Sequence, residues 1–345
     1  MYKLKFIFSL MLGLFFVNEL SAKEIIGFVG KTHEAAKTGS SDCQAATAQT
    51  ELNINNVRTR LLTGGDLWWD LANGKYEVPK VEPGSGEVSK NCMFAGALWI
   101  GGFDALGQLK VAAQTYRQSG NDFYPGPLDA AGEVCQEICS NFDQFWKVTG
   151  TEISSFLTAY EENNGVIAES AVPESLLKWP GRNNPFFTTY HDFELPIDKY
   201  LAPFWDNNED NEYNPLDGDY PVLDPGEDGE GIFADQMIWW VFNDKGNSHS
   251  ETGGEAIGLE LRSLAFAYAT NDDVNNMTFY KYVVENNSST DLDSVYFAQW
   301  ADPDLGNFQD DYVGCDTTNS MGIVYNGDAF DDGLTGYGEE IPMLG

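Results

Sequence analysis

Short apolar runs separated by turn residues restrict the fold of this chain more than any other feature, because they are typical of β-strands joined by hairpins. Met93–Gly101 and Leu109–Thr115 are two such runs, and residues 102–107 between them have the composition of a turn. Residues alternate in a strand-like way over Thr278–Asn286, and Ser294–Trp300 forms a further run. The pattern predicts a mainly β fold of antiparallel strands, as a β-sandwich or a jelly roll.

One segment changes phase partway along. Its apolar residues occupy odd positions up to Leu261 and even positions from Leu264 to Tyr268. A strand with one buried face keeps that face only if an extra residue is absorbed. The sequence therefore predicts a β-bulge near Ser263.

Helix is confined to the middle of the chain. Thr149 and Glu152 have the spacing of a capping box. Helical spacing then follows at Ile153, Phe156, Leu157 and Tyr160. A second short helix is predicted over Pro173–Trp179, ended by Pro180 and Gly181. We expect a small helical insertion near residues 150–180.

The first 22 residues have the features of a secretory signal peptide. Lys3 and Lys5 precede an apolar run from Phe6 to Val17, and small residues end at Ala22. This run is shorter than the roughly 20 residues needed to span a bilayer, and no later run reaches that length. We expect an exported chain, extracellular or on the outer cell surface, with no membrane span after cleavage.

The composition divides the rest of the chain. Residues 23–55 are small and polar and are predicted to form a flexible leader, followed by a β-rich region with short helices over 56–205. Residues 206–231 are dense in Asp, Asn, Glu, Gly and Pro, as in a domain junction or a structured loop. Residues 232–345 are predicted to belong to a β-sandwich that is truncated at its C-terminal end.

The charge excludes several classes of partner. The chain has 54 acidic and 19 basic residues, a net charge of −35. Such a field repels nucleic acids and anionic lipids and attracts cations, multivalent ones most strongly. A solvated acidic surface is the alternative interpretation of the same composition.

Residues 206–219 carry oxygen-bearing side chains at the spacing of a calcium loop, which presents alternate side chains to one ion. The candidate ligands are Asp206, Asn208, Asp210, Glu212, Asp217 and Asp219. Position 6 of such a loop is usually glycine, and here it is Asn211, which adopts left-handed backbone more readily than most residues. A solvated acidic turn is the alternative.

A second acidic loop follows Trp300. Its candidate calcium ligands are Asp302, Asp304, Asn307, Asp310 and Asp311. Five such side chains within ten residues could meet one ion, although their spacing is less regular than that of the first loop. Calcium is therefore the one cofactor that the sequence predicts.

No catalytic motif is present. The three histidines are His33, His191 and His249, and none belongs to a His-Glu-x-x-His zinc-protease motif. The Gly-x-Ser-x-Gly nucleophile elbow is also absent from the sequence. We interpret His191 and Asp192 as a structural pair, and we expect no enzyme activity from any motif in this sequence. The pairs Trp68–Trp69 and Trp239–Trp240 could stack on sugars, but burial in a two-sheet core is the favoured interpretation.

Five cysteines in an exported chain indicate disulfide bonding. Cys135 and Cys139 are close enough in sequence to bridge locally. Cys43, Cys92 and Cys315 are far apart, so one cysteine is left over or pairs outside this chain.

Several long segments resemble a group of large exported Bacteroidetes proteins of the kind secreted by the type IX system. They are Met93–Gly102, Ala113–Pro127, Ala202–Asp206 with Gly218–Pro221, and Trp300–Asp316. The resemblance runs from about Val57 to the last residue and implies that such proteins continue beyond it. In that group the acidic loop usually has glycine where this chain has Asn211, and Asp293–Val295 is similar to its O-glycosylation motif.

These observations lead to one expected function and two alternatives. We expect a calcium-stabilised surface or secreted module that serves adhesion or glycan contact, with a glycan or a surface protein as ligand. The first alternative is the non-catalytic part of an exported hydrolase acting on polysaccharide or protein. The second is a structural component of an extracellular assembly.

Overall fold

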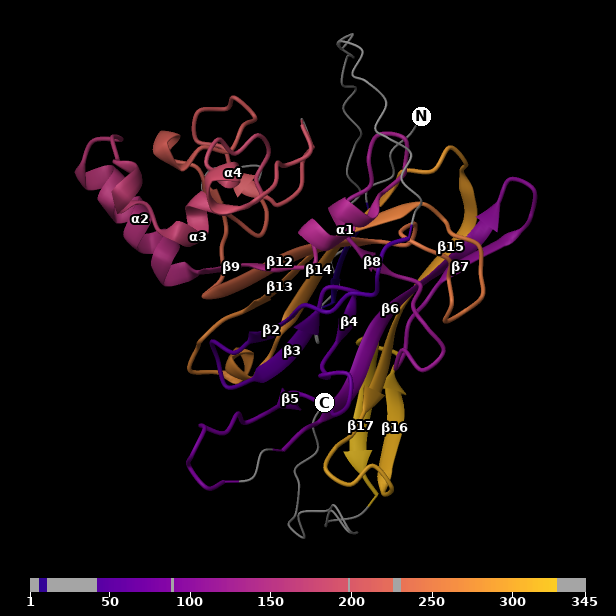
Figure 1. The fold of residues 1–345 in the computed structure, drawn as a ribbon. Helices are drawn as coiled ribbons and strands as arrows, with labels where there is room; N and C mark the ends of the chain where they lie inside the picture. Colours follow the sequence, from indigo (N-terminus) through magenta and orange to yellow (C-terminus); the bar gives the residue numbers. More distant parts are fainter. Residues whose placement is uncertain (1–5, 11–41, 88–89, 198, 226–230, 328–345) are drawn as a thin grey trace.

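Two antiparallel sheets, one of six strands and one of seven, form the body of the molecule (Figure 1). The computed structural model describes residues 6–10, 42–87, 90–197, 199–225 and 231–327. In these residues the fold is mainly β with a few short helices, which confirms the predicted fold class.

The six-stranded sheet has the order β1–β14–β13–β12–β8, and β9 also pairs with β12. The strands are β1 (Phe6–Leu10), β8 (Tyr124–Pro125), β9 (Trp146–Thr149), β12 (Gln236–Asn243), β13 (Leu259–Ala267) and β14 (Phe279–Asn286).

The seven-stranded sheet has the order β15–β6–β4–β3–β2, with β5 paired to β3 and β7 paired to β6. The strands are β2 (Gln49–Leu52), β3 (Arg58–Leu62), β4 (Asp66–Leu67), β5 (Tyr76–Glu77), β6 (Met93–Asp104), β7 (Leu109–Ala112) and β15 (Leu292–Pro303). The predicted hairpin is confirmed, since β6 pairs antiparallel with β7 across the turn.

The two sheets pack face to face around one apolar core, which makes the body a β-sandwich. The indole Nε1 of Trp68, after β4, donates a 2.8 Å hydrogen bond to the hydroxyl of Tyr280 in β14. Leu98 of β6 and Leu261 of β13 belong to the same buried cluster. A Cβ on Gly96 would lie 2.4 Å from the Trp68 ring, so glycine is required where this indole crosses β6.

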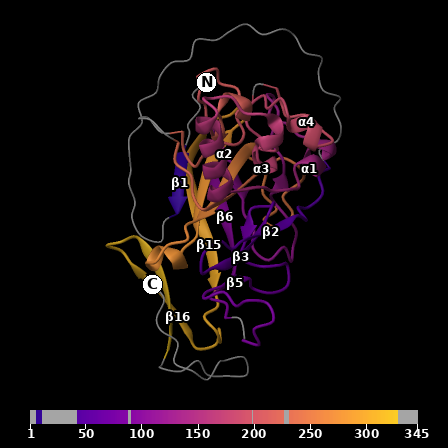
Figure 2. The ribbon, with the colours of Figure 1, turned by 90° about the vertical axis from the view of Figure 1, so that its left-hand side faces the viewer.

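A layer of helices and loops covers the other face of the six-stranded sheet. Its elements are α1 (Gln136–Asn141), α2 (Gly150–Glu162), η1 (Glu169–Ala171), α3 (Glu174–Leu177), α4 (Phe187–Tyr190) and the short pair β10 (Phe204–Trp205) and β11 (Tyr220–Pro221). The predicted capping box is present, because Thr149 and Glu152 each accept a hydrogen bond from the other's backbone amide. Figure 2 shows these helices gathered at one end of the molecule.

The predicted bulge near Ser263 is wrong. Strand β13 pairs in continuous register with β12 and with β14. Its odd side chains, such as Leu261, face the core between the sheets, whereas Leu264 belongs to the second core beneath the helical layer. The change of phase reflects a strand that is buried on both faces, so no extra residue is needed.

The flexible leader predicted over 23–55 is ordered in its last part. Residues 23–41 lie outside the described residues, but β2 is a strand of the sandwich, and Cys43 is bonded to Cys139. The amides of Thr47 and Ala48 also donate to the carboxylate of Asp143. This segment is fixed because its donors and its thiol have partners in the folded body.

The local Cys135–Cys139 bridge that the sequence allowed does not form. Cys135 is the N-cap residue of α1, and helical Cβ atoms one turn apart point in the same direction instead of toward each other. Cys139 faces Cys43, with a Cα–Cα distance of 5.8 Å. In the described part of the chain, Cys92, Cys135 and Cys315 form no disulfide.

The regions separated by composition are interleaved in space. Strand β15 pairs with β6, and β12 pairs with β8 and β9, so each sheet contains strands from both sides of the acidic loop. Phe204 and Tyr220, which flank residues 206–219, belong to the core under the helices. Residues 206–219 therefore form a structured loop of one folded body.

Four further elements of the described chain, two strands and two 3-10 turns, lie outside the two sheets. The hairpin of β16 (Asp311–Asp316) and β17 (Met321–Asn326) projects at the end opposite the helices (Figure 2). The 3-10 turns η2 (Pro215–Asp217) and η3 (Asp273–Asn276) lie in loops. Of the predicted signal peptide, only β1 is described, and it pairs with β14. No helix in the described ranges is long and apolar enough to cross a membrane.

Candidate functional site

The acidic loop that follows β10 is closed by its own side chains. The carboxylate of Asp206 accepts hydrogen bonds from the amides of Asp210 at 3.2 Å and Asn211 at 2.7 Å. Asp210 in turn accepts from the amide of Glu212 at 2.8 Å. Asn211 has a φ of 64°, the left-handed conformation predicted for position 6. The backbone therefore turns as the spacing predicts.

Asp219 is the buried acid of this loop. It is fully buried and accepts 2.8 Å hydrogen bonds from the amides of Asn207 and Asn214. Burial, together with the nearby charges of Asp206 and Asp210, raises the pKa of Asp219 to about 7, against the opposing effect of the two amides. The three carboxylates thus lie close enough to repel one another.

The other predicted ligands of this loop have different partners. The amide nitrogen of Asn208 donates to Asp210 at 2.9 Å, which keeps its side chain inside the loop. The carboxylate of Glu212 accepts from Asn183 at 3.2 Å, and that of Asp217 accepts from Asn214 at 2.6 Å. The structure therefore groups Asp206, Asn208, Asp210 and Asp219, and directs Glu212 and Asp217 to other contacts.

The second acidic loop connects β15 to β16. Burial, together with the charges of Asp302 and Asp311, raises the pKa of Asp304 to about 6. Asp302 accepts a 2.5 Å hydrogen bond from the hydroxyl of Tyr116, and Asp311 accepts one from the amide of Leu305. These three carboxylates are neighbours in the fold.

The remaining two predicted ligands of the second loop form turns. Asn307 is buried, and its side-chain oxygen accepts from the amide of Gln309. The backbone of Asp310 donates to Asn307 and accepts from Gly327. The loop is thereby attached to the end of β17.

The donor sets decide what kind of ion could fit. Among the described residues, no group of three or more His, Cys, Asp or Glu side chains is arranged to hold a metal ion. In the first loop, a hard cation would use amide and backbone oxygens, such as Asn208 Oδ1 and the carbonyl of residue 212, together with carboxylates. Calcium accepts such mixed oxygen ligands in variable number, so the residues of the first loop fit it better than they fit zinc.

The paired tryptophans named from the sequence are buried. Trp68 lies in the core between the sheets and Trp69 in a smaller cluster beside it. Trp239 and Trp240 are 1% and 0% exposed. The prediction of burial is therefore confirmed, and these side chains are excluded as a sugar-binding surface.

A different aromatic surface lies on the outer face of the seven-stranded sheet. Trp99 of β6 and Trp300 of β15 have parallel rings, with 5° between their planes and 6.1 Å between centroids. Phe103 of β6 and Tyr296 of β15 are 41% and 73% exposed on the same face. The sequence analysis missed this surface. The alternation over residues 98–103 nevertheless places Trp99 and Phe103 on one face of the strand and Leu98 and Ile100 on the other.

The histidines have structural surroundings. His191 stacks on Phe187 at 4.1 Å, and Trp146 donates to its Nε2 at 3.4 Å, so its main contacts are aromatic and not Asp192. Both ring nitrogens of buried His249 lie near backbone carbonyls, of Val111 at 2.7 Å and Asp244 at 2.6 Å. His249 is therefore enclosed by the fold, whereas His191 is only partly buried.

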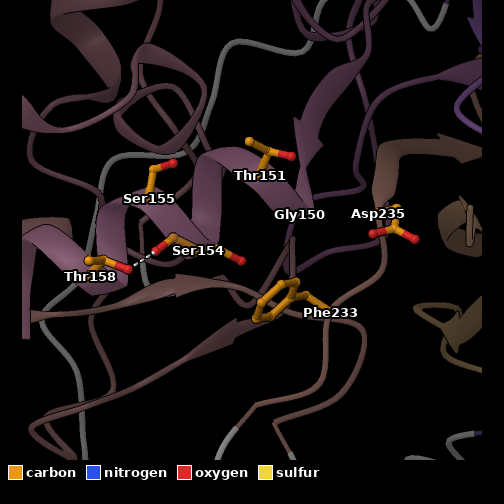
Figure 3. A pocket seen from close by; sticks show the side chains of 7 residues that line it. All are labelled: Gly150, Thr151, Ser154, Ser155, Thr158, Phe233 and Asp235. Atoms are coloured by element: carbon orange, nitrogen blue, oxygen red, sulfur yellow. Dashed lines mark hydrogen bonds between the residues drawn. The ribbon is translucent and has the colours of Figure 1, made fainter.

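Two hollows lie at the helical layer. The first, of about 310 Å³, is lined by the exposed hydroxyl face of α2, with Phe233 and Asp235 opposite (Figure 3). The second, of about 350 Å³, lies between β9 and α3 and includes Lys147, Lys178 and His191. In the first, Thr158 donates to the carbonyl of Ser154. Neither hollow contains a pair of buried acids or a nucleophile with its base.

Comparisons with protein families, with curated proteins and with solved structures found no match for this chain. The functional interpretation therefore depends on the geometry described above.

Proposed function

We propose that this protein is an exported, calcium-stabilised β-sandwich module that contacts a glycan or a protein at an extracellular surface. The observation that carries the calcium part is Asp219, a fully buried carboxylate within the field of Asp206 and Asp210. A bound divalent cation would offset this repulsion, and the binding free energy would add to the stability of the fold.

The position of the first acidic loop supports a stabilising role for a bound ion. The loop connects β10 to β11 and is anchored in the core through Phe204 and Tyr220, so an ion there would stabilise the helical layer. The second loop, with Asp304, directly follows β15. An ion bound there would stabilise the C-terminal end of this strand in the same way. The signal-peptide pattern and the net charge of −35 are what support export and an extracellular setting.

Thermal unfolding of the purified chain tests the calcium part. Free ligand at a hundredfold excess over its Kd stabilises a protein by about 2.7 kcal/mol, which raises Tm by several degrees. We expect chelation to lower Tm, calcium to restore it, and magnesium to restore it less, because magnesium requires a more regular octahedral site.

Matched variants locate the effect. Asp210→Asn should remove part of the calcium-dependent shift, because it deletes one charge while keeping the shape of the side chain. Glu161→Gln, which removes one charge from the exposed end of α2, should leave the shift unchanged. An equal Tm with chelator and with calcium would make both acidic loops solvated turns.

A further inference from the structure

We propose that the outer face of the seven-stranded sheet binds the pyranose rings of a neutral glycan, with the parallel indoles of Trp99 and Trp300 as the contact surface. The inference rests on the proposed contact function and identifies its surface. It does not depend on calcium.

The register of three neighbouring strands creates this face. In β6, Leu98 and Ile100 enter the core between the sheets, so Trp99 points outward. Trp300 of β15 lies opposite Ala97 of β6, and Ala298 of β15 lies opposite Trp99. Ala97 is fully buried, whereas Ala298 is exposed beside Trp99. Phe103, Tyr296 and Leu109 of β7 extend the exposed apolar surface around them.

The two indoles are held in place before any ligand binds. Nε1 of Trp99 donates a 2.8 Å hydrogen bond to the carbonyl of Gln114. Trp300 packs against the edge of Tyr116, with centroids 5.1 Å apart, and Tyr116 donates to Asp302. Because these rings lose little freedom on binding, more of the stacking free energy is available for affinity.

The charges on this face select the ligand. Among the outward-facing strand positions of β6, β7 and β15, Asp293 and Asp302 are acidic and none is lysine or arginine. Carboxylates at both ends can accept hydrogen bonds from sugar hydroxyls, while the indoles contact the apolar C–H faces of the rings. A sulfated or uronic acid polymer would be repelled, and the combination of aromatic rings with carboxylates matches the C–H faces and hydroxyls of a neutral glycan.

A second copy of the chain fits this face less well. Two molecules that each carry a net charge of −35 repel one another, and Asp293 and Asp302 would face the same acidic residues across a symmetric interface. Sedimentation can distinguish self-association through Trp99 from the binding of a glycan.

The test is a titration of the full chain with neutral cello-, manno-, xylo- and malto-oligosaccharides, followed by calorimetry and tryptophan fluorescence. We expect at least one series to bind and to change the tryptophan emission. Trp99→Ala and Trp300→Ala should each weaken binding about tenfold or more, because each removes one stacking surface. The calcium-dependent Tm shift should be unchanged in Trp99→Ala, which separates this proposal from the calcium proposal.

Two further variants distinguish a loss of the binding surface from a general loss of folding. Ala298→Arg places a bulky side chain beside Trp99 without removing either indole, and it should also abolish binding. Phe308→Ala, which removes an aromatic side chain that is 61% exposed in the loop after β15, should leave binding unchanged. Absence of binding in all four series, binding that persists in Trp99→Ala, or a Trp99-dependent dimer in sedimentation without sugar binding would overturn the proposal.

Discussion

Trp239 and Trp240 are consecutive residues of β12, yet they are buried in different cores. Trp239 packs under the helical layer against Trp146, with ring centroids 5.4 Å apart, whereas Trp240 lies between the two sheets. Adjacent side chains of a strand point to opposite faces, so full burial of both requires a covered sheet on each side. This pair shows that the helical layer is a structural part of the fold.

Replacing either tryptophan should therefore destabilise the protein to a similar degree. We expect Trp239→Ala and Trp240→Ala each to lower the free energy of unfolding by about 3–5 kcal/mol, measured by urea unfolding. Trp240→Phe should cost far less, because Nε1 of Trp240 is buried and finds no acceptor among the described residues. A cost below about 1 kcal/mol for Trp239→Ala would show that the helical layer does not cover this sheet.

The disulfide gives a second prediction. Cys43→Ser should lower the free energy of unfolding by roughly 2–5 kcal/mol, because the bond joins residues 96 positions apart. Cys135 lies one helical turn before Cys139 and carries no disulfide in the described structure, so Cys135→Ser should have a small effect on the free energy of unfolding. Peptide mapping under non-reducing conditions should recover a peptide containing Cys43 and Cys139. Recovery of a Cys135–Cys139 peptide instead would contradict the structure.

His191 predicts a dependence of stability on pH. Burial lowers the pKa of His191 below its usual 6.5, against the opposing effect of the Lys178 carbonyl, which lies 3.4 Å from Nε2. The unfolded chain therefore binds this proton more readily than the folded chain as the pH falls below about 6.5, so stability is lost in that direction.

The contribution of His191 should be no more than about 1 kcal/mol, since the ring is only half buried and solvent screens it. The difference in urea midpoint between wild type and His191→Gln should shrink as the pH falls from about 7.5 to about 5.5. A difference that stays constant over this range would mean that His191 does not titrate with unfolding.

Asp219 predicts an effect of substitution that depends on calcium. In chelator, Asp219→Asn removes a buried charge that is repelled by Asp206 and Asp210, but it also leaves one of the amides of Asn207 and Asn214 facing an NH2 group. In calcium, the same substitution should be more destabilising by about 1 kcal/mol or more, because a carboxylate charge beside the ion is lost. Thermal unfolding under both conditions measures this difference. An equal effect of Asp219→Asn in chelator and in calcium would rule out an ion at this loop.

Local patterns predicted the elements of the fold well. The capping box at Thr149, the hairpin of β6 and β7 and the left-handed Asn211 depend on neighbouring residues, and the structure confirms each of them. The pairing of β15 with β6 joins residues about 200 positions apart. No local pattern contains such a pairing, so the order of the strands was not predictable.

The errors have a common physical cause. The bulge at Ser263 was predicted on the assumption of one buried face, and the helical layer supplies a second. The partner of Cys139 and the outward position of Trp99 are likewise set by tertiary packing. Sequence patterns report which residues are apolar, but they do not report what covers each face.

Terbium luminescence tests the central claim about the acidic loop most directly. Terbium replaces calcium at oxygen-rich sites, and its emission is excited by a nearby indole, which Trp205 provides next to Asp206. We predict a saturable emission that calcium displaces, that Asp210→Asn weakens about tenfold or more and that Glu161→Gln leaves unchanged. Absence of emission that calcium can displace, with the chain folded, would contradict a calcium site at residues 206–219.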